Sequence, residues 1–402
     1  MKIDEIIDIT ADIKWIGIPD PDLATFDIVM QTRYGTTYNS YFINAEKKTI
    51  IETSKENFKD VYLEKVKKVV NPSEVEYIVL DHTEPDHSGN LKHLLQICPN
   101  ATVVGSGTAL TYLQDMIDFP FKSLRVKDGD KLSLGNKTLS FISAPNLHWA
   151  DSIFTYLEED QLLFTCDSFG AHFCPDGIFD DQERNYEEAY KFYFDVILKP
   201  FSKFMLKAIE KIRPLAIKAI CPGHGPVLRS SWKQKVDLAE KYAQEYLNNT
   251  TSEKGNILVA YISAYGYTKN MAGEVIKGIQ SVSSIPVEAV DIEKLPLGEL
   301  EEKIVKSRAI LVGSPTINQN TLLPVYRLFS IINPIRDRGK LAAAFGSYGW
   351  SGEAVKIIED NLTNLKLKIA CEGLREKFYP YKDKAEKSFE FGKQFGTAVQ
   401  QQ

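Results

Sequence analysis

The sequence predicts an α/β protein of two domains, the second of them a doubly wound parallel sheet. The chain has 402 residues, and one hydrophobic core rarely serves more than about 250 to 300 residues. Apolar runs of strand length alternate with helix-compatible stretches, and this alternation becomes most regular towards the C-terminus. Such alternation is typical of α/β folds.

A hydrophilic passage, AQEYLNNTTSEKGN at 243–256, separates two patterns of elements. We place the domain boundary inside it, near 251–254, which gives domains of 1–252 and 253–402. Before the boundary, strand-like runs alternate with helical stretches such as 56–70, where apolar residues recur at helical spacing. The first domain is therefore expected to be a mixed α/β unit.

The second domain contains five apolar runs, each followed by a loop and usually by a helix-compatible stretch. These runs are NILVAYI (256–262), PVEAVDI (286–292), RAILVGS (308–314), KLAAAFG (340–346) and LKLKIAC (365–371). Five such units predict parallel strands with helices on both faces of the sheet.

Composition and charge exclude several classes of partner. A net charge of -6 provides no basic field for nucleic acid or anionic lipid. The N-terminus carries acids where a signal peptide needs an apolar segment, and no apolar run approaches the roughly 18 residues of a membrane span. Five scattered cysteines without a CxxC pair indicate reduced thiols. We therefore expect a cytoplasmic protein.

Potential metal ligands follow four apolar runs of the first domain. YIVLD precedes His82, LSFISAP leads to His148, QLLFTC reaches Asp167, and AIKAIC leads to His224. We expect these four strand ends to converge on one rim. Histidine and carboxylate side chains together are typical of a transition-metal site.

The segment HTEPDH, from His82 to His87, concentrates ligands most strongly. If it is extended, side chains repeat with period two, so that His82, Glu84 and Asp86 point to one side and His87 opens the next segment. A solvated turn is the alternative, but the distant strand ends supply further ligands of matching type and favour a metal site. His93, in the helical-looking NLKHLLQI, is interpreted as structural.

The H-x-E-x-D-H pattern resembles the H-x-H-x-D-H motif of the metallo-β-lactamase fold, an αβ/βα sandwich that holds two metal ions. Glu84 stands where the zinc hydrolases have histidine. A carboxylate there hardens the site and favours iron over zinc. In this variant the sequence resembles the flavodiiron proteins.

That resemblance implies a pair of irons and assigns their ligands. One iron would be bound by His82, Glu84 and His148, the other by Asp86, His87 and His224, with Asp167 bridging them. His172, in FGAHF, resembles the family's histidine near the open face of the metals, where it would donate a hydrogen bond to substrate or relay a proton.

The stretch SAYGYTKN at 263–270 follows the first strand of the second domain, and a helix-compatible segment begins near Lys269. Backbone N–H groups at a helix start, with the hydroxyls of Ser263 and Thr268, can hold a phosphate, and Gly266 permits close backbone approach. Simple helix capping is the alternative interpretation.

Two further loops, SPTINQN at 314–320 and GSYGWSGEA at 346–354, follow the third and fourth strands and support a mononucleotide site. The domain resembles flavodoxin binding FMN. The implied FMN-binding residues are Ser263, Tyr265, Gly266, Tyr267, Thr268, Ser314, Pro315, Thr316, Asn318, Ser347, Tyr348, Gly349 and Trp350.

The resemblance implies an enzyme that reduces O2 to water, NO to N2O, or both. Reduced FMN holds two electrons and a diferrous pair two more, which matches the four electrons that O2 needs. The chain has no rubredoxin-like segment with paired cysteines, so we expect an external donor such as rubredoxin or reduced deazaflavin. In the family the flavin of one subunit faces the irons of another, which implies a head-to-tail homodimer or a dimer of dimers.

Three other functions remain open at this point. A zinc hydrolase fused to a flavodoxin would use the same framework of metal ligands. Glu84 argues against it, because zinc hydrolases have histidine at that position. A redox carrier or gas sensor without turnover would use the same cofactors. A structural metal site would have complete protein coordination and no place for substrate.

Overall fold

The computed structural model describes residues 1–26, 30–182, 186–250, 255–379 and 382–401. The chain divides into two compact units, Met1–Glu245 and Tyr246–Gln402. The boundary expected near 251–254 lies outside the described residues, and helix α7 (Trp232–Thr250) extends through the first half of the hydrophilic passage. No helix in the described part of the chain is long and apolar enough to cross a membrane.

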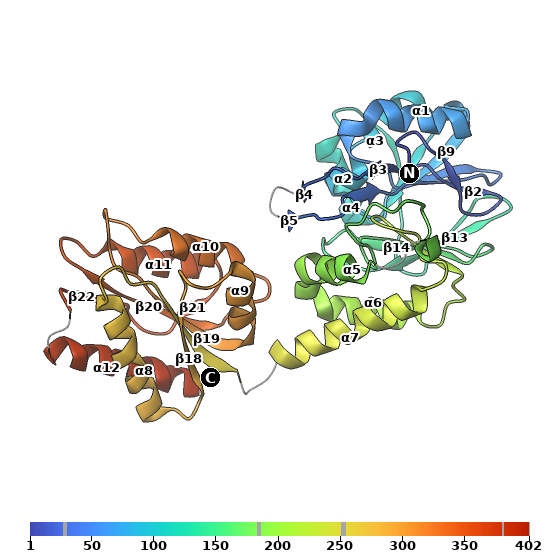
Figure 1. The fold of residues 1–402 in the computed structure, drawn as a ribbon. Helices are drawn as coiled ribbons and strands as arrows, with labels where there is room; N and C mark the ends of the chain where they lie inside the picture. The colour runs from blue at the N-terminus through green and yellow to red at the C-terminus, as the bar shows by residue number, and fades with distance from the viewer. Residues whose placement is uncertain (27–29, 183–185, 251–254, 380–381, 402) are drawn as a thin grey trace. The chain divides into compact units, whose positions relative to one another are not determined.

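Two sheets form the centre of the first unit (Figure 1). One sheet has the order β1 (Ile7–Asp8), β2 (Ile13–Trp15), β7 (Tyr41–Ile43), β8 (Lys48–Ile51), β9 (Val75–Val79), β10 (Thr102–Gly105) and β11 (Lys122–Arg125). The other has the order β12 (Lys131–Ser133), β13 (Thr138–Ser143), β14 (Ile153–Leu157), β15 (Leu162–Cys166) and β16 (Ala219–Pro222).

Apolar side chains fill the space between the two sheets and cover their outer faces. Trp15, Val79, Phe141 and Phe164 belong to one buried cluster that both sheets share. The outer face of the first sheet packs on α1 (Lys59–Val69), α3 (Leu91–Ile97) and α4 (Gly107–Met116). That of the second packs on α5 (Glu187–Tyr193), α6 (Ser202–Ile212) and α7. The αβ/βα sandwich is confirmed.

Two short antiparallel pairs of strands lie outside these sheets. β3 (Ile18–Asp20) pairs with β6 (Thr36–Tyr38), and β4 (Thr25–Phe26) pairs with β5 (Met30–Gln31). They bring Phe26 and Thr36 against the histidines described below.

The second unit is a parallel sheet of order β18 (Val287–Asp291), β17 (Asn256–Tyr261), β19 (Ser307–Gly313), β20 (Leu341–Tyr348) and β21 (Lys368–Ile369). Strand order 2-1-3-4-5 is the flavodoxin-like doubly wound arrangement. Helices α8 (Tyr267–Val282) and α12 (Lys382–Gln400) cover one face, and α9 (Leu297–Lys306), α10 (Leu323–Ile331) and α11 (Glu353–Asn364) cover the other (Figure 1).

The fifth strand differs from the prediction. LKLKIAC forms only the two-residue strand β21, and the pairing with β20 continues in β22 (Leu374–Lys377). Lys366 adopts a left-handed backbone (φ 67°), and the backbone N–H groups of Leu367 and Lys368 bond to Leu362 and Lys340. These loop contacts leave 365–367 outside the strand.

Candidate functional site

The ends of strands from both sheets of the first unit carry the predicted metal ligands. His82 and Glu84 follow β9, Asp167 directly follows β15, and His224 follows β16. His148 lies between β13 and β14. The ligand atoms that follow these strands lie close together in two groups.

The alternation expected for an extended HTEPDH does not reach Asp86, because the segment becomes helical at Pro85. Pro85–Ser88 forms the one-turn helix α2, with Pro85 at its first position, where its fixed φ suits a helix start. Asp86 and His87 consequently project from a helical turn and not from a strand. Glu84 and Asp86 enter two different clusters of candidate ligands.

The first cluster contains His82, Glu84, His148 and Asp167, whose ligand atoms all lie within 4.8 Å of one another. His82 Nε2 and His148 Nε2 lie 3.2 and 3.0 Å from Glu84 Oε2. Asp167 Oδ2 lies 2.9 Å from His148 Nε2 and 3.5 Å from His82 Nε2.

The second cluster contains Asp86, His87 and His224, again with ligand atoms within 4.8 Å. His224 Nε2 lies 3.1 Å from Asp86 Oδ2. The other oxygen of Asp167, Oδ1, lies 3.0 Å from His87 Nε2 and 3.4 Å from His224 Nε2. Asp167 thus presents one carboxylate oxygen to each cluster.

When no metal is bound, protons on the histidines form the hydrogen bonds between the imidazoles and carboxylates of the two clusters. Burial opposes charge on His148, but hydrogen bonds to Asp167 and Glu84 prevail and raise the pKa of His148 to about 10. Burial also opposes charge on Asp167, yet His87 and its neighbours hold the pKa of that carboxyl well below its usual range. Metal ions replace such protons when they bind.

His172 is buried beside the second cluster and differs from the other histidines. Its ring packs against a tilted Phe26 ring at 4.2 Å and edge-to-face against Tyr193 at 4.8 Å, measured between centroids. Burial and the neighbouring His224 lower the pKa of His172 to about 3. Nδ1 lies 3.1 Å from Thr36 Oγ1, while Nε2 has no hydrogen-bond partner among the described residues. A neutral imidazole with one unused nitrogen therefore lies at the site.

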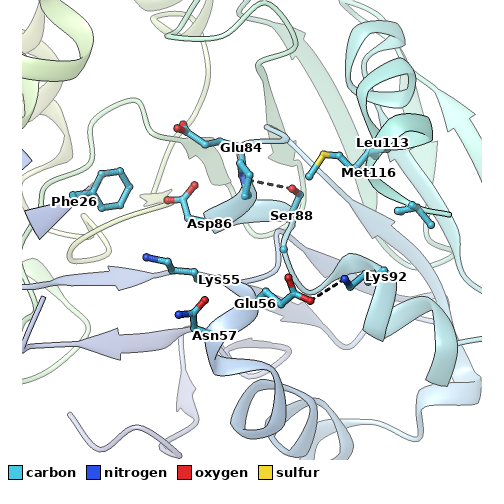
Figure 2. Close-up of a pocket in the computed structure, with 13 residues that line it drawn as sticks. Phe26, Lys55, Glu56, Asn57, Glu84, Asp86, Ser88, Lys92, Leu113 and Met116 are labelled. Atoms are coloured by element: carbon cyan, nitrogen blue, oxygen red, sulfur yellow. Dashed lines mark hydrogen bonds and ion pairs between the residues drawn. The ribbon is translucent and has the colours of Figure 1, made fainter. Parts of the chain in front are cut away.

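A cavity of about 320 Å³ borders both clusters. Figure 2 shows Glu84 and Asp86 on its wall together with Phe26 and Lys55. Glu84 belongs to the first cluster of candidate ligands and Asp86 to the second. The cavity therefore reaches one carboxylate of each cluster.

In the second unit the three predicted loops follow β17, β19 and β20, which are neighbours in the sheet. Gly266 adopts a left-handed conformation (φ 84°) immediately before α8, with open space where a Cβ would lie. Thr268 Oγ1 lies 3.0 Å from Ser347 Oγ, and the N–H of Thr316 donates to the carbonyl of Ser347 at 2.9 Å. These contacts join the three loops.

The remaining predicted residues belong to the same three loops. Tyr265 and Trp350 are 81% and 85% exposed, which leaves both rings available for a planar ligand. Tyr267 begins α8, Tyr348 ends β20 and Asn318 lies in a left-handed turn (φ 53°). The second and third loops also contain Ser314, Pro315 and Gly349.

Matches to known proteins agree with this architecture. A model of the ODP family beta lactamase matches residues 36–225, and a flavodoxin model matches residues 259–392. The chain is 38% identical over 396 residues to a flavo-diiron protein from Clostridium acetobutylicum, in a match that covers 96% of this chain and 97% of that protein. A type A flavoprotein from Rhodobacter capsulatus is 34% identical, with 95% and 88% covered.

The chain belongs to the flavodiiron family. Among solved structures, rubredoxin oxygen:oxidoreductase from Desulfovibrio gigas superimposes with a TM-score of 0.71 at 26% identity, covering 99% of each chain. The flavodiiron protein from Giardia intestinalis has a TM-score of 0.68 at 28% identity, covering 100% and 98%. The family confirms the predicted cofactors, FMN and a non-haem pair of irons.

The side chains of this flavodiiron protein fit both cofactors. Imidazole and carboxylate groups form two clusters of a size that suits one ion each, and the buried Asp86 Oδ1 has no hydrogen-bond partner in the described part of the chain. The buried Ser263 Oγ is likewise without a described partner, and it lies in the loop that leads to the helix start at Gly266. A phosphate suits that position.

Four residues near the metal clusters escaped sequence reasoning. Tyr193 donates a hydrogen bond from its hydroxyl to Asp167 Oδ1 at 3.0 Å, and Glu52 and Asp151 contact the outer nitrogens of His87 and His82. The carbonyl of Thr37 lies 2.6 Å from His224 Nδ1. The sequence holds no local signal for Tyr193, since an aromatic residue in a helix usually packs in a core.

Proposed function

We propose that this protein reduces O2 to water, NO to N2O, or both, at a pair of irons that FMN re-reduces. The observation that supports this most strongly is the carboxylate-rich double cluster in which Asp167 directs one oxygen to each half. Glu84 gives the first cluster two carboxylates beside two imidazoles, a harder set of donors than zinc hydrolases use.

In this proposal each cluster holds one iron. The first is bound by His82, Glu84 and His148, and the second by Asp86, His87 and His224. Asp167 would offer one carboxylate oxygen to each iron. When bound, the irons supply the site that activates the gas and FMN supplies its electrons.

The chain's own residues would control protons and water around the gas. His172 is neutral because its pKa is low, so its Nε2 can donate to, or accept from, a molecule in the site without carrying charge. Tyr193 keeps a hydrogen bond on Asp167 and thereby orients that carboxylate. Phe26 covers His172 and limits the entry of bulk water.

The electron donor and the assembly extend the proposal. A relative named rubredoxin oxygen:oxidoreductase supports a rubredoxin as donor, and reduced deazaflavin is the alternative. The exposed rings of Tyr265 and Trp350 support a flavin edge that is covered by a second copy in a head-to-tail homodimer or a dimer of dimers. Light scattering combined with turnover assays tests this: a monomer with full turnover contradicts it.

Anaerobic stopped-flow mixing tests the reaction. Fully reduced protein is mixed with O2 or with NO, and the flavin and iron absorbances are followed. We expect rapid oxidation of both by at least one gas, with water or N2O as product. Absence of oxidation by either gas, combined with ester hydrolysis by zinc-loaded protein, would instead establish the hydrolase.

A further inference from the structure

Two buried carboxylates lie behind the histidines of the metal clusters. Glu52 follows β8 and Asp151 precedes β14, and they are only 2% and 0% exposed. Glu52 Oε2 lies 2.8 Å from His87 Nδ1. Asp151 Oδ1 lies 3.3 Å from His82 Nδ1. Each carboxylate thus faces the ring nitrogen that points away from the clustered ligand atoms.

Glu52 differs from Asp151 in what its second oxygen binds. Glu52 Oε1 accepts hydrogen bonds from the backbone N–H groups of Asp81, at 2.5 Å, and His82, at 3.2 Å. Asp151 Oδ2 accepts from the backbone and hydroxyl of Thr83, at 2.8 and 2.7 Å. Glu52 therefore links the segment that carries the first cluster to a ring of the second, whereas Asp151 contacts the first cluster alone.

The backbone at Glu52 also departs from ordinary strand geometry. Its φ is 59°, a left-handed conformation that costs free energy in a residue with a side chain. Its N–H donates to the carbonyl of Val79 at 2.9 Å, and its carbonyl accepts from Ser40 Oγ at 2.8 Å. These contacts keep the conformation that aims the side chain at His87.

We infer that Glu52 is a positioning residue that selects the metal-binding tautomer of His87 and ties the two halves of the site together. The inference rests on the ligand assignment proposed above. A carboxylate accepts hydrogen bonds, so the hydrogen of His87 resides on Nδ1 and the lone pair of Nε2 is free for a metal. Asp151 acts in the same way on His82.

Cys166 lies on the same side of His87 without changing this assignment. Its sulfur is 3.9 Å from His87 Nδ1 and forms, with Glu52 and His87, a third cluster of ligand-type atoms. Because Nδ1 carries a hydrogen towards Glu52, the same nitrogen cannot bind a further ion.

The substitution Glu52→Gln tests the inference because glutamine has the same size but a different donor pattern. If its oxygen keeps the two backbone hydrogen bonds, its NH2 group faces His87 Nδ1 and donates to it. The hydrogen of His87 then moves to Nε2 and opposes metal binding. Full-length, metal-free protein is reloaded anaerobically with Fe(II) against a competing chelator. We expect the second iron to bind 10- to 100-fold more weakly and the first within about threefold of wild type.

Asp151→Asn is the matched control, because it should weaken the iron held by His82 and leave the other unchanged. Mössbauer spectra of ⁵⁷Fe-loaded proteins distinguish the two, since each variant should lose a different one of the two iron signals. Near-ultraviolet circular dichroism of the metal-free variants reports folding. If Glu52→Gln does not fold, zinc-loaded wild-type protein with ¹⁵N-labelled histidine serves instead: His87 must carry its hydrogen on Nδ1, and a hydrogen on Nε2 overturns the inference.

The outcomes separate the inference from the proposed function. Two irons in wild type and two equally tight irons in Glu52→Gln overturn the inference and leave the function intact. Equal weakening of both irons in both variants shows general destabilisation and also overturns it. Wild-type protein that cannot hold two irons overturns the ligand assignment and this inference together.

Discussion

Glu84 is the residue at which this chain departs from zinc-dependent metallo-β-lactamases. Its Oε2 lies about equally far from two imidazoles, 3.2 Å from His82 Nε2 and 3.0 Å from His148 Nε2. The carboxylate therefore lies between the two rings of the first cluster, where its charge acts on both.

Glu84→His should convert the first cluster to a zinc-type donor set. When the variant is expressed with both metals present, we expect zinc to displace iron and gas reduction to fall at least about 100-fold, because imidazole favours zinc. Metal analysis and stopped-flow kinetics measure both effects. Glu56→Gln, an exposed acid on the wall of the same cavity, should retain iron and rate. A Glu84→His protein with two irons and full activity would contradict this interpretation.

His172→Ala separates hydrogen bonding to the gas from metal binding. His172 is not a member of either cluster, so both irons should remain, while O2 or NO reduction should slow by up to about tenfold, the loss expected when one hydrogen bond from a neutral imidazole is removed. Because the pKa of His172 is about 3, the wild-type rate should show no step from this residue as the pH is varied around neutrality. Iron content, rates and the pH profile provide the test. Loss of iron would indicate a structural role instead.

The sequence predicted residues with local signatures and missed those that depend on strand pairing. The metal ligands were recognised because HTEPDH and the later histidines follow apolar runs. Glu52 has no such signature: it precedes His82 by 30 positions and reaches it only because β8 pairs in parallel with β9. Tyr193 was missed for a related reason, since it ends helix α5 and its partner Asp167 is 26 positions away in the sequence.

Among elements, the loop that opens α8 has the clearest link between backbone and function. Gly266 holds a left-handed φ of 84°, and no described atom lies within 4 Å of the place that a Cβ would take there. A side chain would therefore meet no described neighbour, and the backbone conformation alone favours glycine.

Gly266→Ala should weaken FMN binding by up to about tenfold, because alanine costs roughly 1 to 2 kcal/mol in this conformation. Gly273→Ala, inside α8 and also in open space, is the matched control and should leave FMN affinity unchanged or stabilise the helix. Titration of flavin-free protein with FMN, followed by flavin fluorescence, measures both. Equal effects of the two substitutions would exclude the proposed backbone role.

Helix α1 buries Lys65 against β2, where its ammonium lies 4.4 Å above the ring of Trp15. Burial lowers the pKa of Lys65 to about 7, although Asp4 and Glu5 oppose the shift. Between pH 7 and the ordinary lysine pKa the unfolded chain therefore binds more protons than the folded chain. The folded state gains stability as pH rises through this window.

Lys65→Met removes this dependence. Relative to the variant, wild-type protein should gain about 2 kcal/mol of unfolding free energy between about pH 7 and pH 9. Urea unfolding followed by tryptophan fluorescence measures the difference. Lys68→Met, at an exposed position of the same helix, should show no such change. A wild-type advantage that stays constant or shrinks as the pH rises contradicts the assigned shift.

Sequence periodicity predicted which helices and strands are present better than it predicted the residues at which they begin and end. The helices of the second unit and four of its strands lie where expected, because buried parallel strands are continuous apolar runs. The prediction of a fifth strand over the whole apolar run was wrong. That run forms a two-residue strand and a loop, and the pairing with β20 resumes in β22. In HTEPDH the alternation expected for an extended segment ends at Pro85, since proline favours a helix start.

At the scale of the whole molecule, two units of different fold supply two different cofactor sites. One places imidazoles and carboxylates at strand ends of a sandwich, and the other places loops at the carboxyl ends of a parallel sheet. The predicted fold class is confirmed for both. The proposed boundary between residues 252 and 253 and the proposed dimer remain predictions.

Metal content of protein purified anaerobically from iron-replete cells tests the central claim most directly. Inductively coupled plasma mass spectrometry gives the number and type of ions per chain. The double cluster around Asp167 predicts two irons per chain and negligible zinc. Two zincs with little iron, reproduced under the same iron-replete conditions, would contradict a diiron reductase.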